Sequence, residues 1–264
     1  MAAKKAQSHS KPVSRVAIVP AKPGRLSGKV AVITGASRGI GYAIARALAA
    51  ENCNVVITGR TEESLTAAGM RLSLSTPENS ALILSKVCDV RDPDAVEELF
   101  TTVEAMFGRL DILVNNAGIG QPPTPLEQTS LEVWRDLLDT NLTGMFLCTR
   151  AALPLMERGA TIITNLSAAA KQTFPQFAAY TAAKSGGYGF TLSLRDELMP
   201  RGIRVTALMP GATATDMWQQ IMPNADRERM IDVETVAQAV LYAVLLPPEA
   251  NLSELLLLPT VGAV

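Results

Sequence analysis

The sequence predicts an α/β fold in which one parallel, doubly wound sheet carries helices on both faces. Three observations support this prediction. Short runs rich in β-branched residues alternate with longer stretches that have helical spacing. The runs are almost continuously apolar, as strands buried on both faces are. Small, polar and flexible residues follow most of the runs, which is typical of the sheet edge where such folds bind ligands.

Seven such runs follow Lys29 along the chain. Right-handed crossovers between successive runs would place all of them in one parallel sheet. The sequence contains neither a linker nor an internal repeat between them, so we expect a single domain over residues 26–264. The runs lie at residues 30–34, 54–58, 81–87, 110–116, 161–167, 203–209 and 252–258.

The composition argues against several classes of function. The chain holds 24 basic and 25 acidic residues, so it has no charge surplus that would suit nucleic acid. No apolar run approaches the roughly 20 residues of a membrane span. The single histidine, His9, lies near the N-terminus, so we expect neither a Ser-His-Asp triad nor a multi-histidine metal site in the domain. The three cysteines form no C-x-x-C pair, and we therefore expect reduced thiols and a cytoplasmic protein.

Residues 1–25 differ from the rest of the chain in charge. They contain six basic residues and no acidic one, which gives this segment a charge of +6 and leaves −7 on the remainder. We interpret the segment as a basic, disordered extension. A targeting peptide is the alternative, although the segment lacks a long apolar stretch.

The first run is followed by TGASRGIG, residues 34–41, and then by a helical stretch. Glycines let a backbone turn tightly beside a pyrophosphate, and a helix N-terminus offers unpaired N–H groups and a partial positive charge. The spacing is GxxxGxG rather than GxGxxG, and a glycine turn without a ligand is the alternative. The candidate phosphate-binding residues are Gly35, Ser37, Arg38, Gly39, Ile40 and Gly41.

The second run ends at Arg60, with no acidic residue at the strand end. In dinucleotide-binding folds, an acidic residue at the end of the second strand hydrogen-bonds the ribose 2′-hydroxyl of NAD(H). An arginine nearby instead accommodates the 2′-phosphate of NADP(H). Arg38 would face the same pocket, and two guanidiniums can clamp a phosphate. Glu62 and Glu63 are alternative ribose readers, but we expect them in the first turn of the next helix, where negative charge is favoured. The sequence therefore predicts NADP(H) in preference to NAD(H).

Tyr180 and Lys184 lie four residues apart in an alanine-rich helical stretch, so they share one face of the helix. A free tyrosine has a pKa of about 10, and a cation beside it lowers that pKa. The phenol would then approach the range in which general acid–base catalysis is effective. Such pairs are common on helices. Ser167, which ends the fifth run at the same sheet edge, supports a catalytic interpretation because its hydroxyl can bind a substrate oxygen.

Taken in order, these motifs resemble the short-chain dehydrogenase/reductase family over residues 26–260. The resemblance implies a Rossmann-type sheet of seven strands in the order 3-2-1-4-5-6-7. It also implies a nicotinamide cofactor and hydride transfer between this cofactor and an alcohol or carbonyl carbon. The motifs are TGASRGIG, Asp89 after the third run, NNAG at 115–118, Asn141 in TNLTG, Ser167, Tyr180-x-x-x-Lys184, and Pro210-Gly211 with Thr213 and Thr215.

The resemblance also implies roles for individual positions. Asp89 and Val90 would contact the adenine ring. Asn141 would anchor a water molecule that relays protons to Lys184, and Lys184 would also bond the nicotinamide ribose. Thr213 stands where the family usually has valine or isoleucine. The other implied cofactor contacts are Asn116, Ala117, Gly118, Tyr180, Pro210, Gly211, Thr213 and Thr215.

An apolar set of residues predicts the kind of substrate. Residues 217–222, MWQQIM, would cover the substrate, and Phe174 and Phe177 precede Tyr180. Packing of a lid alone is the alternative. We therefore expect an NADP(H)-dependent oxidoreductase for a small-molecule carbonyl or alcohol with an apolar portion. The resemblance implies a homodimer or homotetramer. A 3-oxoacyl-[acyl-carrier-protein] reductase and a non-catalytic NADP(H)-sensing protein remain as alternative functions.

Overall fold

The computed structural model of this chain describes residues 24–76 and 81–261. Its centre is a parallel sheet of seven strands in the order β3-β2-β1-β4-β5-β6-β7, which confirms the predicted fold and topology. The basic extension expected over residues 1–25 lies outside the described residues, except for Gly24 and Arg25. The strands are β1 (Val30–Ile33), β2 (Asn54–Gly59), β3 (Ile83–Val87), β4 (Ile112–Asn115), β5 (Thr161–Asn165), β6 (Arg204–Pro210) and β7 (Glu254–Leu257).

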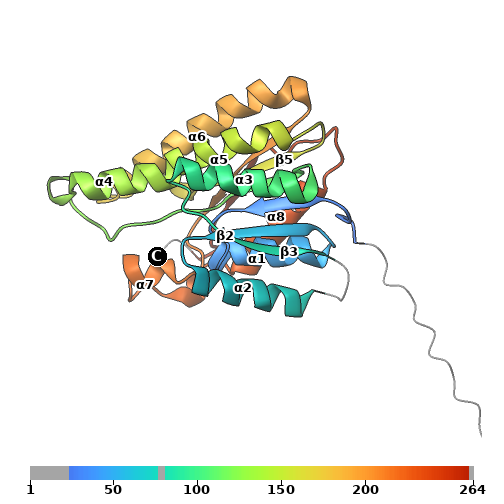
Figure 1. Cartoon of the computed structure of the whole chain (residues 1–264). Coiled ribbons are helices and arrows are strands. Elements are labelled where there is room, and N and C mark those ends of the chain that lie inside the picture. The colour runs from blue at the N-terminus through green and yellow to red at the C-terminus, as the bar shows by residue number, and fades with distance from the viewer. Residues whose placement is uncertain (1–23, 77–80, 262–264) are drawn as a thin grey trace, which may run out of the picture.

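Helices cover both faces of this sheet (Figure 1). One face carries α1 (Gly39–Ala50), α2 (Glu62–Ser75) and α8 (Val233–Leu245). The other face carries α3 (Pro93–Phe107), α5 (Gly144–Ala152) and α6 (Ala178–Leu198). The two remaining α-helices are α4 (Leu131–Leu138), which packs beside α6, and the short α7 (Met217–Ile221).

Successive residues of β1 belong to opposite cores. Ala31 and Ile33 pack in the cluster under α1, α2 and α8, whereas Val30 and Val32 pack in the cluster under α3, α5 and α6. This alternation follows from the geometry of a strand, whose side chains point to its two faces in turn. Because both faces are covered, every position of the strand is apolar, and the sequence shows a continuous run.

Capping residues fix where α3 begins and ends. The Asp92 side chain accepts a hydrogen bond from the backbone N–H of Asp94, and Pro93 occupies the first helical position. Gly108 ends the helix in a left-handed conformation, with a φ of 65°. The start of α3 limits the loop after β3 to a few residues, and this loop contains Asp89.

The described residues hold no helix that is long and apolar enough to cross a membrane. In the same two ranges, 24–76 and 81–261, we find no group of three metal-ligating side chains. Cys53, Cys88 and Cys148 are buried free thiols. Burial raises the pKa of Cys53 to about 12 and that of Cys88 to about 11, which makes these thiols unreactive at neutral pH.

Asp111, just before β4, is a buried carboxylate that pairs with two half-exposed cations. Its carboxylate accepts hydrogen bonds from Arg109 Nε and Lys29 Nζ, both at 2.9 Å, and from the backbone N–H of Val30 at 3.0 Å. Burial on its own would raise the pKa of Asp111. The two cations and the N–H group outweigh it and hold the pKa below its ordinary value.

We expect Asp111→Asn to lower the free energy of unfolding at neutral pH by roughly 2 kcal/mol, because Lys29 and Arg109 lose a charged partner. The pKa of Asp111 is lower in the folded than in the unfolded state. Its contribution is therefore present above the unfolded pKa and is lost as the pH falls through the folded pKa. Urea denaturation of both proteins, from about pH 7 to about pH 3, measures this difference. A difference that stays constant over this range would contradict the prediction.

Candidate active site

A cleft of about 430 Å³ opens at the carboxyl edge of the sheet, where the sequence predicts the site. Loops that follow β1 to β6 form its walls, together with parts of α6 and α7. Gly41 is the one predicted site residue outside the lining; it lies in α1, where an added Cβ would collide with the Asn116 amide. The others line the cleft: Gly35, Ser37, Arg38, Gly39, Ile40, Arg60, Asp89, Val90, Asn116, Ala117, Gly118, Asn141, Ser167, Tyr180, Lys184, Pro210, Gly211, Thr213 and Thr215.

The loop from β1 to α1 brings its backbone close to the cleft. Gly35 and Gly39 have φ angles of 63° and 58°, which side chains disfavour. A Cβ at Gly35 would lie 2.8 Å from the Cα of Ala117. Helix α1 begins without a side-chain cap and without an acidic residue in its first turn, unlike α3, α4 and α8. Its first N–H groups thus stay available to an anion, and the loop fits a cofactor diphosphate.

Two exposed arginines stand beside this loop. Arg38 directly precedes α1 and Arg60 directly follows β2, and both line the cleft. Within the described residues, neither of them takes part in an ion pair. Glu62 and Glu63 lie in the first turn of α2, as expected, and do not line the cleft. Two available guanidiniums next to a diphosphate site fit a 2′-phosphate.

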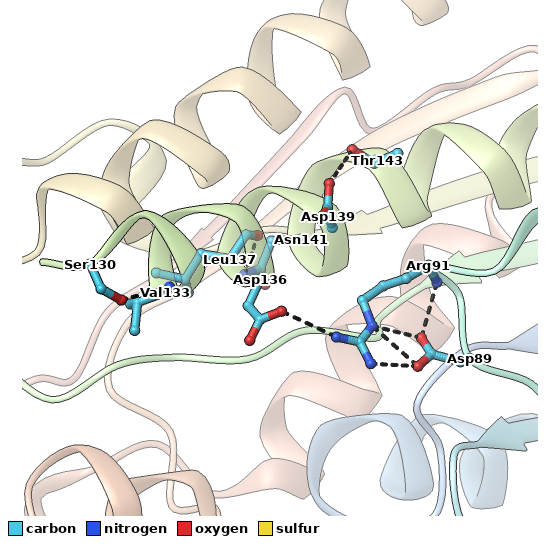
Figure 2. A network of polar contacts seen from close by, with 9 residues as sticks. All are labelled: Asp89, Arg91, Ser130, Val133, Asp136, Leu137, Asp139, Asn141 and Thr143. Atoms are coloured by element: carbon cyan, nitrogen blue, oxygen red, sulfur yellow. Dashed lines mark hydrogen bonds and ion pairs between the residues drawn. The ribbon is translucent and has the colours of Figure 1, made fainter.

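Asp89 and Val90 lie in the loop after β3 and line the same end of the cleft. The Asp89 carboxylate is bound by the guanidinium of Arg91, whose Nη2 is 2.7 Å from Oδ2 (Figure 2). This hydrogen bonding lowers the pKa of Asp89. Arg91 is not among the predicted site residues. The only signal for it in the sequence is its place two residues after Asp89.

The side-chain amide of Asn116 connects the ends of neighbouring strands through hydrogen bonds. Its Nδ2 donates to the carbonyl oxygens of Thr34 at 2.9 Å and Gly35 at 3.0 Å. Its Oδ1 accepts a hydrogen bond from Asn165 Nδ2 at 2.8 Å. The amide of Asn116 therefore joins the ends of β1, β4 and β5 and shapes the cleft floor. Sequence reasoning missed Asn165, which lies two residues before Ser167.

Tyr180 and Lys184 come from α6 and meet Ser167 from the loop after β5. The two helical residues share one face, with Lys184 Nζ 5.7 Å from the centroid of the Tyr180 ring. Lys184 is 4 % exposed, and its Nζ donates to the carbonyl oxygen of Asn165 at 3.3 Å. Ser167 Oγ accepts from the backbone N–H of Ala169 at 3.1 Å, which holds the hydroxyl at the end of a short 3-10 turn.

The surroundings of Tyr180 shift the pKa of its phenol. Burial raises it, and the neighbouring Ser167 hydroxyl opposes this only in part. The Lys184 ammonium lies over the face of the ring. That the charge of Lys184 lowers the pKa of the phenol stays a prediction. Burial also lowers the pKa of Lys184, to about 8, so its side chain stays mostly charged at neutral pH.

Asn141 lies in a π-helical turn, Asp139–Thr143, between α4 and α5. Its Nδ2 donates to the carbonyl oxygen of Leu137, four residues earlier, at 3.0 Å. This bond competes with the helical backbone pattern, which explains the wider turn. Nδ2 also donates to the Ile119 carbonyl oxygen at 3.0 Å, and Oδ1 accepts from the Ile119 N–H at 3.2 Å. The Asn141 side chain thus connects the loop after β4 to the end of α4.

The segment after β6 forms one wall of the cleft. Trp218 Nε1 donates to the carbonyl oxygen of Thr213 at 2.9 Å, and the Thr213 hydroxyl donates to the carbonyl oxygen of Gly211 at 3.0 Å. Both bonds hold α7 and the residues before it against the cleft. The apolar residues expected to contact a substrate all line the cleft: Phe174, Phe177, Met217, Trp218, Ile221 and Met222.

Comparison with known proteins agrees with this geometry. Residues 29–226 match the family model of the short chain dehydrogenases. A 3-oxoacyl-[acyl-carrier-protein] reductase from Synechocystis sp. is 41 % identical over 198 residues, which cover 74 % of this chain and 78 % of that protein. A metagenomic short-chain oxidoreductase solved in complex with NADP is 34 % identical, with a TM-score of 0.76 and coverage of 89 % and 99 %. Carveol dehydrogenase from Mycobacterium avium, in complex with NAD, is 27 % identical, with a TM-score of 0.79 and coverage of 89 % and 98 %.

Proposed function

The chain belongs to the short-chain dehydrogenase family, and from this we propose that it is an NADP(H)-dependent oxidoreductase that interconverts a carbonyl and an alcohol. One observation carries the proposal. Tyr180, Ser167 and Lys184 converge in the same cleft as the uncapped N-terminus of α1 and two arginines. A cofactor with a diphosphate and a substrate oxygen would therefore meet in one space.

The cleft offers a partner for each part of NADP(H). The N-terminus of α1 would bind the diphosphate, and Arg38 and Arg60 would bind the 2′-phosphate. Asp89 and Val90 would contact the adenine, and the loop at 210–215 would hold the nicotinamide. Solved relatives include complexes with NADP and with NAD. The two arginines favour NADP(H), because the end of β2 carries no acid for a ribose hydroxyl.

The protein's own residues would orient the substrate and move its proton. The nicotinamide, when bound, gives the hydride to the carbonyl carbon or takes it back. Ser167 and Tyr180 would hold the carbonyl oxygen, and Tyr180 would donate its phenolic proton to that oxygen during reduction. A phenol keeps its proton at neutral pH and is therefore available as a general acid. Lys184 would bind the nicotinamide ribose and supply positive charge beside the phenol.

The substrate would carry an apolar portion. The wall formed by α7 presents methionine, tryptophan and isoleucine side chains, and the opposite wall presents Phe174 and Phe177. Residues 205–226 contain no lysine and no arginine. A strongly anionic substrate would therefore find no cation on this wall, whereas an apolar group would displace water from it.

A 3-oxoacyl-[acyl-carrier-protein] reductase is the second candidate, and the relative from Synechocystis sp. favours it. The consumption of NADPH, followed by absorbance with a panel of ketones, aldehydes and 3-oxoacyl thioesters, separates the possibilities. We expect turnover of ketones or aldehydes with apolar substituents. Turnover of the thioesters alone would favour the second candidate. Tight NADPH binding without turnover of any compound would instead favour a nucleotide-sensing protein.

We further propose a homodimer or homotetramer that assembles through α4, α5 and α6. Phe146 on α5 is 42 % exposed and lies edge-to-face against Phe190 of α6, so these helices present aromatic surface to solvent. Such a surface suits burial against a second copy.

We also propose that the protein is cytoplasmic, because three buried free thiols suit a reducing compartment.

We expect Tyr180→Phe to lower turnover by about 10²–10⁴-fold, because phenylalanine cannot donate a proton to the substrate oxygen. NADPH affinity should stay nearly unchanged. Tyr188→Phe is the matched control: Tyr188 lies two turns further along α6, and its hydroxyl donates to Glu254 Oε1 at 2.6 Å, outside the cleft. Steady-state kinetics and cofactor titration of both variants provide the test. Wild-type turnover in Tyr180→Phe would refute the assigned role.

We expect Arg60→Ala to weaken NADPH binding by about tenfold, with little change in NADH binding, because only NADPH carries the 2′-phosphate. Arg46→Ala serves as the control. Arg46 lies on α1, pairs with Glu234 and does not line the cleft, so its loss should alter neither affinity. Fluorescence titration with both cofactors measures the change. Wild-type protein that binds NADH as tightly as NADPH would contradict the proposed preference.

A further inference from the structure

We infer that Arg91 is a positioning residue for the cofactor: it holds the Asp89 carboxylate where this group accepts a hydrogen bond from the exocyclic amine of adenine. The inference rests on the proposed NADP(H) function and adds a residue that does not itself line the cleft. Figure 2 shows the two side chains facing each other in the loop after β3.

Arg91 contacts both oxygens of the Asp89 carboxylate. The backbone N–H of Arg91 donates to Oδ1 at 3.0 Å. Its Nε lies 3.1 Å from both Oδ1 and Oδ2, and its Nη2 donates to Oδ2 at 2.7 Å. A carboxylate at the end of a strand would otherwise rotate about its side-chain bonds. The planar guanidinium of Arg91 and its backbone N–H together hold the Asp89 carboxylate in one orientation.

The clamp leaves Asp89 able to accept another hydrogen bond. The two oxygens of a carboxylate offer about four lone-pair sites, and the contacts from Arg91 come from only three of its nitrogens, because Nε is shared between both oxygens. The Asp89 side chain is 31 % exposed and lines the cleft. A donor in the cleft, such as the amino group of adenine, can therefore reach an oxygen whose direction Arg91 has already set.

A second carboxylate steadies Arg91 itself. Its Nη1 lies 3.3 Å from Oδ1 of Asp136 on α4 (Figure 2). Hydrogen bonding with Asp89 and the charge of Asp136 raise the pKa of Arg91, which therefore stays charged. The guanidinium spans from the loop after β3 to the helix that leads into the turn of Asn141.

Charge gives Arg91 a second effect on the cofactor site. Arg60 is close enough to Asp89 to contribute to the low pKa of that carboxylate. Without Arg91, the uncompensated carboxylate would attract Arg60 and repel a phosphate nearby. Arg91 therefore leaves Arg60 available for the 2′-phosphate while it orients Asp89 for the adenine.

The test compares NADPH with its deamino analogue, in which hypoxanthine replaces adenine and the exocyclic amine is absent. Affinity is measured by fluorescence titration without substrate, so turnover does not enter. We expect wild-type protein to bind NADPH about tenfold more tightly than the analogue. Arg91→Met should reduce this ratio to less than about twofold, because the carboxylate is no longer aligned. Arg91→Lys, which keeps the charge without the fork, should restore part of the ratio.

Arg109→Met is the matched control. Arg109 binds Asp111, two residues along the chain, in a similar fork, but neither residue lines the cleft. This variant should keep the wild-type ratio even if it lowers stability. A wild-type ratio near one, an unchanged ratio in Arg91→Met, or an equal loss in Arg109→Met would overturn the role of Arg91. Failure of wild-type protein to bind NADPH at all would overturn the proposed function as well.

Discussion

The side chain of Asn116 holds together the part of the sheet on which the whole site depends. It bonds carbonyl groups at the end of β1 and receives a bond from Asn165 at the end of β5. The glycine loop, the floor of the cleft and the backbone carbonyl that receives Lys184 are all placed by this one amide. Loss of this partly buried amide would remove three hydrogen bonds at once, each contributing about 0.5–1.5 kcal/mol.

Burial shifts the pKa values of Tyr180 and Lys184 in opposite directions. It raises the pKa of the Tyr180 phenol and lowers the pKa of the Lys184 ammonium. Removal from water disfavours the charged form of both groups. The cleft thus holds a neutral acid next to a cation that is only moderately stable, and positive charge brought in by a ligand would act directly on the phenol.

Residue patterns predicted the fold and the place of the site because both follow from local rules. Apolar runs such as 30–34 identify buried strands, and the glycines before α1 indicate a tight turn from strand to helix. The pKa of Tyr180 could not be predicted, since it depends on how much protein surrounds the phenol. The bonds of Asn116 and Asn141 join segments far apart in the chain. Arg91 was missed because no spacing rule connects an arginine to a cofactor that it does not touch.

The π-helical turn at Asn141 determines how the structure would respond to the loss of one residue between α4 and α5. It inserts one extra residue between α4 and α5, and each residue of an α-helix turns the following side chains by about 100°. The apolar side of α5 faces the sheet, with Leu147, Cys148 and Ala152 in the core, while α4 packs on α6. The wider turn accommodates this residue, so α4 and α5 keep their packing while Asn141 reaches the loop after β4. Loss of one residue from this turn would therefore disturb the contacts of Asn141 with Ile119 rather than the core beneath the helices.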